Sequence, residues 1–364
     1  MIDCGSSMPT NAPIKSAIEF KQAADKTVVD SRARFRQALC CVVEQRRGQY
    51  PDERNCEDIL HDLGDELPLQ APWQLPAASQ QPSNLTVILV SGVLWECVSG
   101  TVNPFGAGKG EEASAADYDY LKPHFPVVEV VKVAGRASSK YNGKIVADAI
   151  HESVLHYPNN DIVVVAYSKG AADTLEALRQ MGEASAVPAN LKALVTTTGA
   201  IYGSPLGDEL DGIYKTLFAK LPWPSCRPVD DQPIESISRS ARMHWMADHW
   251  NELPKGIRYY SLGVYDAPEN QHWALSPLSK HLAKFDARND SHMIYSDQIL
   301  PESQLLGYIK ADHWSFVLPF NRNKHPFWRP FFNDNNAFPR EVLFESLLRY
   351  VEADMSEANA AELP

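Results

Sequence analysis

The chain has 364 residues, 44% of them hydrophobic, so it can bury one large α/β domain with additions or two smaller domains. Its formal net charge of −12 at pH 7 argues against a nucleic-acid partner, which would need a clustered basic surface. No apolar run approaches the roughly 18 residues needed to cross a bilayer. We therefore expect a chain without a transmembrane segment, cytoplasmic as written.

The N-terminus offers a second interpretation of the compartment. Residues 1–7 lack the charged and apolar regions of a secretory signal. Cys4-Gly5-Ser6-Ser7 nevertheless looks like the first residues of a mature bacterial lipoprotein. If the true start lies upstream of Cys4, we expect an exported, lipid-anchored protein.

Six cysteines are spread along the chain without a Cys-x-x-Cys pair or regular spacing. This spacing does not favour a metal cluster. We expect free buried thiols, with a disulfide between the Cys40-Cys41 pair and Cys56 as the alternative.

Residues 1–83 are interpreted as an N-terminal tail, helices and a proline-rich linker. Apolar residues recur at helical spacing in residues 17–47 and again in residues 55–67. Residues 68–82 contain four prolines and many polar residues, which is typical of a linker or an extended arm. The main domain is therefore expected to begin at residue 84.

Residues 84–354 alternate between apolar strands and helices. This alternation predicts an α/β domain with a mostly parallel, doubly wound sheet. The expected strands are 85–90, 127–133, 162–166, 191–198, 257–263 and 305–309, and the expected helices include 143–156, 276–285 and 339–353. Residues 355–364 are interpreted as a C-terminal tail.

An insertion at about 204–255 interrupts the alternation. It is rich in aromatic residues and methionine, and two helices are expected on either side of a proline-rich turn. One interpretation is a helical cap over an apolar substrate cleft. The other is ordinary core packing of an extra helical pair, and the sequence does not separate the two.

The most informative stretch runs from Ile162 to Leu178. An uninterrupted apolar strand, Ile162 to Ala166, leads to Ser168, and strong helix formers follow from Gly170 onward. This is a strand, a sharp turn and a helix with a serine at the apex, which can expose a nucleophilic hydroxyl. The residues read Ala166-Tyr167-Ser168-Lys169-Gly170 where the usual elbow is Gly-x-Ser-x-Gly, and an ordinary βα loop is the alternative.

A nucleophilic serine needs a base, and His313 is the expected one among eleven histidines. It follows a late strand and lies in a short polar loop before an aromatic run. His244, His249, His272, His281 and His292 are expected at the surface or in the cap. No His-Glu-x-x-His or comparable spacing occurs, so neither a catalytic metal nor another cofactor is expected.

The chain resembles bacterial α/β-hydrolases of the lipase and carboxylesterase type from about Arg32 to Phe320. The resemblance rests on Cys56-Glu57-Asp58, Val90-Ser91-Gly92-Val93, Tyr167-Ser168-Lys169-Gly170-Ala171, Gly203-Ser204-Pro205-Leu206, Asn289-Asp290 and the segment from Leu305 to Trp314. It implies an α/β-hydrolase fold and a serine, acid and histidine in that chain order.

Three aspartates compete for the acid. Asp290 is preferred because it matches the acid turn of such lipases, with Asn289-Asp290-Ser291 where they carry Asn-Asp-Gly. Asp297 is an alternative nearer to His313 in the chain. Asp266 is another, because it directly follows a predicted strand.

The expected chemistry is ester hydrolysis through an acyl-enzyme. The N–H groups of Val93 and Lys169 are expected to form the oxyanion hole. The substrate would be a small-molecule or polymeric ester of apolar character, polyesters included. A thioesterase or acyltransferase on the same fold, or a catalytically silent binding protein, are the alternatives, and the oligomeric state is not predicted.

Overall fold

The structure is a computed structural model that describes residues 28–66, 69, 73, 75–76, 82–92, 118–209, 229–230, 236–315 and 337–361. Within these residues seven strands form one sheet in the order β1-β7-β6-β5-β4-β2-β3, and each neighbouring pair is parallel. The strands are β1 (Val29–Asp30), β2 (Leu85–Val90), β3 (Val127–Val131), β4 (Asp161–Tyr167), β5 (Leu191–Thr197), β6 (Arg258–Tyr265) and β7 (Gln304–Lys310).

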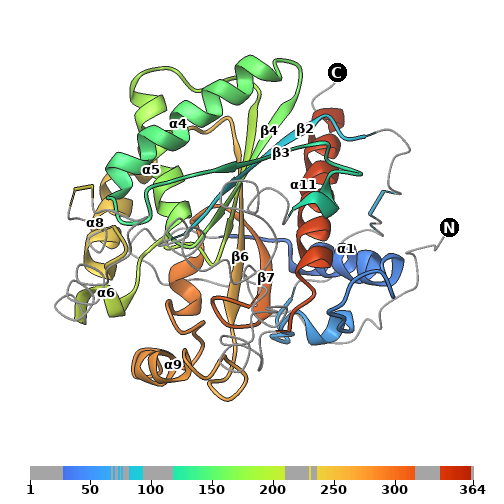
Figure 1. Ribbon diagram of the computed structural model, residues 1–364, viewed down its shortest axis with the longest axis vertical. Coiled ribbons are helices and arrows are strands. Elements are labelled where there is room, and N and C mark those ends of the chain that lie inside the picture. Colours follow the sequence, from blue (N-terminus) through green and yellow to red (C-terminus); the bar gives the residue numbers. More distant parts are fainter. Residues whose placement is uncertain are drawn as a thin grey trace, which may run out of the picture.

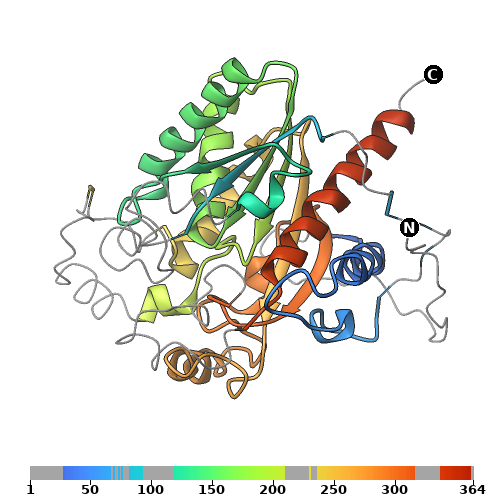
Figure 2. The ribbon, with the colours of Figure 1, turned by 45° about the vertical axis from the view of Figure 1, so that its right-hand side comes forward.

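Helices cover both faces of this sheet (Figure 1). On one side lie α4 (Ser139–His156), α5 (Lys169–Glu183) and α8 (Arg239–His249). On the other side lie α1 (Arg32–Gln45) and α11 (Arg340–Ala361), and Figure 2 shows α11 crossing that face. The predicted α/β, doubly wound architecture is confirmed. Two shorter helices, α6 (Pro205–Glu209) and α9 (Ser276–Leu282), lie toward the edge where the strands end.

The central strands are apolar throughout because both of their faces are buried. In β4, Val163 and Val165 point into the core that α1 and α11 close, together with Phe35 and Leu343. The alternate residues Ile162, Val164 and Ala166 belong to the opposite core, with side chains from α4, α5 and α8. Since successive side chains of a strand point to opposite faces, a run without polar residues is what such a strand requires.

The N-terminal segment departs from its prediction in two places. Val29 and Asp30 were expected in a helix over 17–47, but they form β1, which pairs with β7; the helix begins at Arg32, and residues 17–27 lie outside the described part. Of the predicted helix over 55–67, the described residues 55–66 contain a single short turn of 3-10 helix, Cys56–Asp58, after which Leu60 pairs with Ile309. In both places pairing with β7 takes the backbone out of the helical conformation.

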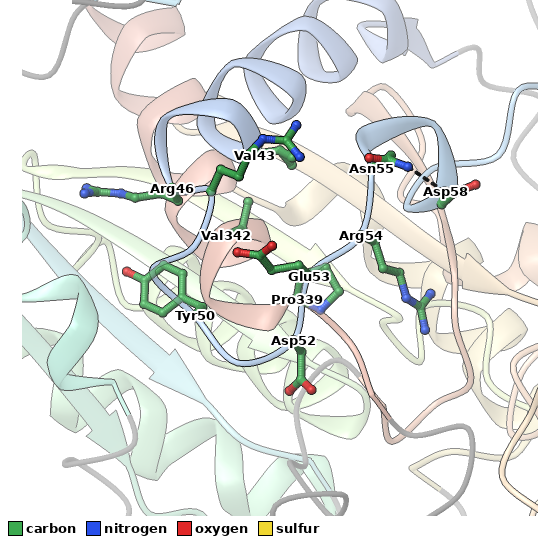
Figure 3. Close-up of a pocket in the computed structure, with 11 residues that line it drawn as sticks. Val43, Arg46, Tyr50, Asp52, Glu53, Arg54, Asn55, Asp58, Pro339 and Val342 are labelled. Atoms are coloured by element: carbon green, nitrogen blue, oxygen red, sulfur yellow. Dashed lines mark hydrogen bonds between the residues drawn. The ribbon is translucent and has the colours of Figure 1, made fainter.

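Cys40 and Cys56 form a disulfide, with their Cα atoms 5.0 Å apart, so the expectation of free thiols is wrong here. Cys41 is also disulfide-bonded. The loop that the Cys40–Cys56 bond closes, together with Pro339 and Val342, lines a surface pocket of about 290 Å³ (Figure 3). Charged side chains dominate its lining, among them Arg46, Glu53 and Arg54.

The C-terminal helix is longer than predicted. We expected a helix over 339–353 and a tail over 355–364, but α11 continues to Ala361. The helix stays packed as far as Met355, which is buried in the same core as Phe35, and then becomes exposed at Ser356 and Glu357. No helix in the described residues is long and apolar enough to cross a membrane.

The described part of the insertion at 204–255 contains α6, α8 and a short 3-10 helix, Trp250–Glu252. In α8, Met246 is buried, and so is Trp250 just after it; both pack in the core beside α4 and α5. These side chains therefore follow the core-packing interpretation of the insertion. Residues 210–228 and 231–235, which include Trp223, lie outside the described residues, as does the glycine-rich segment 106–110.

Candidate active site

Ser168 lies at a sharp turn between β4 and α5. Its backbone has φ 56° and ψ −126°, a conformation that costs a non-glycine residue energy and is concentrated at functional sites. The turn fits only because Gly170 has no side chain: a Cβ there would lie 2.5 Å from the Ser91 carbonyl oxygen. This is the strand, turn and helix predicted from the sequence.

A chain of hydrogen bonds joins three residues from distant parts of the sequence. Ser168 Oγ lies 2.9 Å from His313 Nε2, and His313 Nδ1 lies 2.7 Å from Asp290 Oδ2. All three side chains are buried, at 8%, 4% and 0% exposure. The structure thus brings together the preferred serine, histidine and aspartate of the sequence analysis, each on a loop after a strand or a strand and helix.

The turn that carries Asp290 gives its carboxylate several donors. Oδ1 accepts from the N–H groups of His292 at 2.9 Å and Met293 at 2.7 Å, while Oδ2 also accepts from the Thr198 hydroxyl. Burial alone would raise the pKa of Asp290, but the adjacent His313 ring, through its charge and its hydrogen bond, and the Thr198 hydroxyl hold that pKa below its ordinary value. The carboxylate is therefore ionised and ready to face a positive imidazole.

The two alternative aspartates bond elsewhere. Asp297 forms an ion pair with Arg239 of α8 at 2.7 Å. Asp266 accepts from the Ala267 N–H at 2.7 Å and from the Asn270 amide at 2.9 Å. Neither is hydrogen-bonded to His313 among the interactions of the described residues, so only Asp290 has the geometry of an orienting acid.

Several neighbours of this grouping were not anticipated. Thr198 lies at φ 41° directly after β5, and its hydroxyl is 3.2 Å from His313 Nδ1. The Tyr167 hydroxyl donates to the His313 carbonyl at 2.7 Å. The position of Tyr167 beside the predicted serine could have suggested this contact, but nothing in the sequence marks Thr198.

Two histidines contradict their predicted place at the surface or in the cap. His272 is 0% exposed. His292 stacks on His313, with ring centroids 4.2 Å apart and an angle of 15° between the planes. Burial, followed by the nearby His313 ring, lowers the pKa of His292 to about 3, so it is neutral at physiological pH.

Lys169 begins α5, so its N–H has no acceptor within the helix and is available to a ligand. Its side chain is buried and forms an ion pair with Asp173 at 2.6 Å. Asp173 also accepts from Ser139 at 2.6 Å and Asn142 at 2.8 Å, which anchors the first turn of the helix. Val93 lies outside the described residues, but a Cβ on the preceding Gly92 would lie 2.9 Å from that of Ser168.

Asp290, His292 and His313 lie close enough together to resemble a metal site, since one possible ligand atom from each lies within 4.8 Å of the others. His313 Nδ1 and Asp290 Oδ2 already bond to each other. The two imidazole rings are nearly parallel, so the lone pairs of their nitrogens lie in two separate planes. They do not converge on one position where a metal ion could bind both. These residues therefore fit a metal ion poorly.

The chain matches no known protein-family profile and no curated protein. Among solved structures it is similar to a metagenomic carboxyl esterase, with 30% sequence identity and a TM-score of 0.77, over 94% of this chain and 97% of that one. It is also similar to the mature form of a Bacillus licheniformis lipase, with 19% identity and a TM-score of 0.50, over 71% and 95% of the two chains. The second likeness concerns the fold alone, whereas the first extends to sequence over nearly the full length. The chain belongs to the α/β-hydrolases, among their carboxylesterase- and lipase-like members.

Proposed function

We propose that the protein is a serine esterase in which Ser168 is the nucleophile, His313 the general base and Asp290 the acid. The hydrogen-bond chain from Ser168 Oγ through His313 to Asp290 carries this proposal. The contact of Ser168 with His313 has the length that proton transfer from a serine to an imidazole requires, and the contact of His313 with Asp290 has the length of an orienting hydrogen bond. The likeness to a carboxyl esterase supports the same chemistry.

In the proposed reaction, Ser168 Oγ attacks the carbonyl carbon of an ester while His313 Nε2 takes its proton. Asp290 holds Nδ1–H and stabilises the imidazolium that forms. His313 then gives the proton to the leaving alcohol, and an acyl-enzyme remains on Ser168. Water, activated by His313, attacks the acyl-enzyme to release the carboxylic acid and restore the serine.

The oxyanion of each tetrahedral intermediate would accept hydrogen bonds from the N–H groups of Lys169 and Val93. The Lys169 N–H is at the start of α5, where the helix dipole also favours negative charge. One such donor is typically worth about 3 to 4 kcal/mol of barrier. Gly92, the residue before Val93, lies against Ser168, since a Cβ on it would be 2.9 Å from the Ser168 Cβ.

The nucleophile is tested by Ser168→Ala, measured on a panel of p-nitrophenyl esters from acetate to palmitate. We expect turnover to fall about a millionfold, because the acyl-enzyme cannot form. A fluorophosphonate probe should label the wild-type protein at Ser168. Ester hydrolysis that survives in the alanine variant would contradict the assignment, and a wild-type protein without labelling would favour a silent binding protein.

The panel also addresses the acyl group. A thioester and an emulsified polyester assayed beside the p-nitrophenyl esters distinguish a carboxylesterase from a thioesterase and test polymeric substrates. All three substrates would use the same serine, so the ratio of their kcat/KM values is the readout.

The compartment is part of the proposal. The Cys40–Cys56 disulfide is typical of proteins that fold in an oxidising environment and is unusual in the cytosol. This supports the exported alternative over the cytoplasmic one.

A further inference from the structure

We propose that His292 is a positioning residue whose neutral ring stacks on His313, holds it in plane and stabilises its charged form during catalysis. This inference rests on the proposed role of His313 as general base. It adds a fourth residue to the proposed serine, histidine and aspartate.

The first support is the geometry of the stack. The two rings lie 4.2 Å apart and 15° from parallel, so each imidazole offers a flat face to the other. Hydrogen bonds already fix the edge of the His313 ring, since Nδ1 faces Asp290 and Nε2 faces Ser168. Those two hydrogen bonds hold only the edge of the His313 ring. Tilting of the ring about the line through Nδ1 and Nε2 is limited by whatever lies against its face. His292 supplies the stacked contact, and the tilted Tyr167 ring also lies near His313, at 5.2 Å between centroids.

The second support is how firmly His292 itself is held. Its N–H donates to Asp290 Oδ1 at 2.9 Å, and its carbonyl accepts from the Ser204 hydroxyl. Its ring also contacts Trp314, at 6.1 Å between centroids. The backbone of His292 is therefore tied both to the acid turn and to the start of the insertion, so the ring has a fixed place.

The third support is charge. When His313 accepts the serine proton, it becomes an imidazolium, and a neutral aromatic face attracts such a cation. The low pKa of His292 keeps it neutral, so it does not repel the new charge. The acidic and phenolic groups next to His313 are Asp290, which bonds to it, Tyr167, which donates to its carbonyl, and Asp312, which precedes it in the chain. The Ser168 and Thr198 hydroxyls face its ring nitrogens.

The test compares His292→Phe with His292→Leu. Phenylalanine keeps a flat ring without nitrogens, whereas leucine fills a similar volume without a ring. We expect the Phe variant to retain kcat within about twofold. The Leu variant should lose about three- to tenfold in kcat with KM nearly unchanged, which is the effect of an aromatic contact on a barrier.

If His292 had only a structural role, its replacement would not change the pH dependence of kcat/KM. That pH dependence is therefore the second measurement. Without the aromatic face, the imidazolium of His313 is less stable, so the acid limb of kcat/KM should shift to lower pH in the Leu variant and stay in place in the Phe variant. His156→Leu, an exposed histidine at the end of α4, is the matched control and should change neither. Thermal midpoints report whether each variant is folded.

Two outcomes overturn the inference. A Leu variant with wild-type kcat and pH profile would show that the stack does nothing for His313. A folded Phe variant as impaired as the Leu variant would show that a ring nitrogen matters instead of the ring face. If the wild-type protein hydrolyses no ester and a fluorophosphonate does not label Ser168, the proposed function itself has failed, whereas an active wild type with an unaffected Leu variant overturns this inference alone.

Discussion

Asp290 and Asp297 lie in one short segment and are both buried, at 0% and 2% exposure, yet their surroundings push their carboxylates in opposite directions. Asp290 receives two backbone N–H groups, and its pKa is lowered. Asp297 faces mainly one guanidinium, that of Arg239, and burial raises its pKa to about 6. Burial is thus common to both, and the partner decides the outcome: the His313 ring outweighs burial at Asp290, whereas the Arg239 guanidinium does not outweigh it at Asp297.

The difference explains which of the two can serve a catalytic histidine. An orienting acid must stay ionised when the imidazole is neutral as well as when it is charged. The turn 289–294 also gives the Asp290 carboxylate two N–H donors that do not depend on the charge of the imidazole, whereas Asp297 is paired with the side chain of a residue in the insertion. Position in the sequence alone would not have separated these two aspartates.

The largest effect that tests this comparison is expected from Asp290→Asn. The amide has nearly the shape of the carboxylate but carries no charge, and it can hold the wrong tautomer of His313. We expect kcat to fall about ten-thousandfold with little change in the thermal midpoint. The assay is hydrolysis of a short-chain p-nitrophenyl ester at pH 8.

Asp297→Asn and Asp266→Asn are the matched controls, since each removes one negative charge from a candidate acid. Both should retain ester hydrolysis, because neither carboxylate bonds to His313 among the described residues. If one of them loses activity as severely as Asp290→Asn, the acid has been assigned to the wrong residue.

Much of the fold could be predicted from the sequence because both faces of the central strands are buried. The strand Leu85–Val90 was predicted with its observed bounds, and β4 and β5 differ from prediction by a residue or so. The errors fall where long-range contacts override local pattern. Val29–Asp30 becomes a strand only because β7 lies beside it, and residues after Asp58 leave the helical conformation to pair with the same strand.

The site was predicted less completely, for a physical reason. Ser168 and His313 each follow a strand, so the ends of parallel strands brought them together. His292 and Thr198 reach the site through turns with special backbone geometry and through ring stacking, which leave no periodic signal. The disulfide was considered but not preferred, because pairing of cysteines depends on a geometry that spacing does not fix.

A smaller effect is expected from Asp297 on stability. Its pKa is about 6 in the folded protein and about 3.9 in an unfolded chain, so between these values the folded state binds more protons. Its contribution to stability is therefore highest below about pH 4 and decreases as the pH rises to about 6. This decrease is at most about 3 kcal/mol, and the partial exposure of Arg239 reduces it.

Asp297→Asn removes that titration. We expect the free energy of unfolding at pH 7 to stay the same or to rise by about 1 to 2 kcal/mol, and its decline from pH 4 to 6 to become shallower. Urea unfolding at pH 4.5 and pH 7 measures both. A loss of stability at pH 7 would mean that the ion pair with Arg239 outweighs the cost of burying the charge.

The smallest effect is expected at Ser291, the residue that follows the proposed acid. Ser291 has φ 77°, a left-handed conformation that costs a non-glycine residue roughly 1 to 2 kcal/mol. Its hydroxyl donates to the Asp290 carbonyl, and glycine would lose that bond and gain freedom in the unfolded chain. These terms nearly cancel, so Ser291→Gly should change stability by about 1 kcal/mol or less and preserve activity.

Ser291→Val is the matched contrast, because a β-branched residue tolerates positive φ poorly and also lacks the hydroxyl. We expect it to lower the thermal midpoint clearly and to reduce kcat, since the turn that aims Asp290 must distort. Comparing midpoints and kcat of the two variants separates backbone conformation from the hydroxyl. If glycine reduced activity as much as valine did, the hydroxyl bond to the Asp290 carbonyl, and not the left-handed turn, would be what keeps the carboxylate of Asp290 aligned with His313.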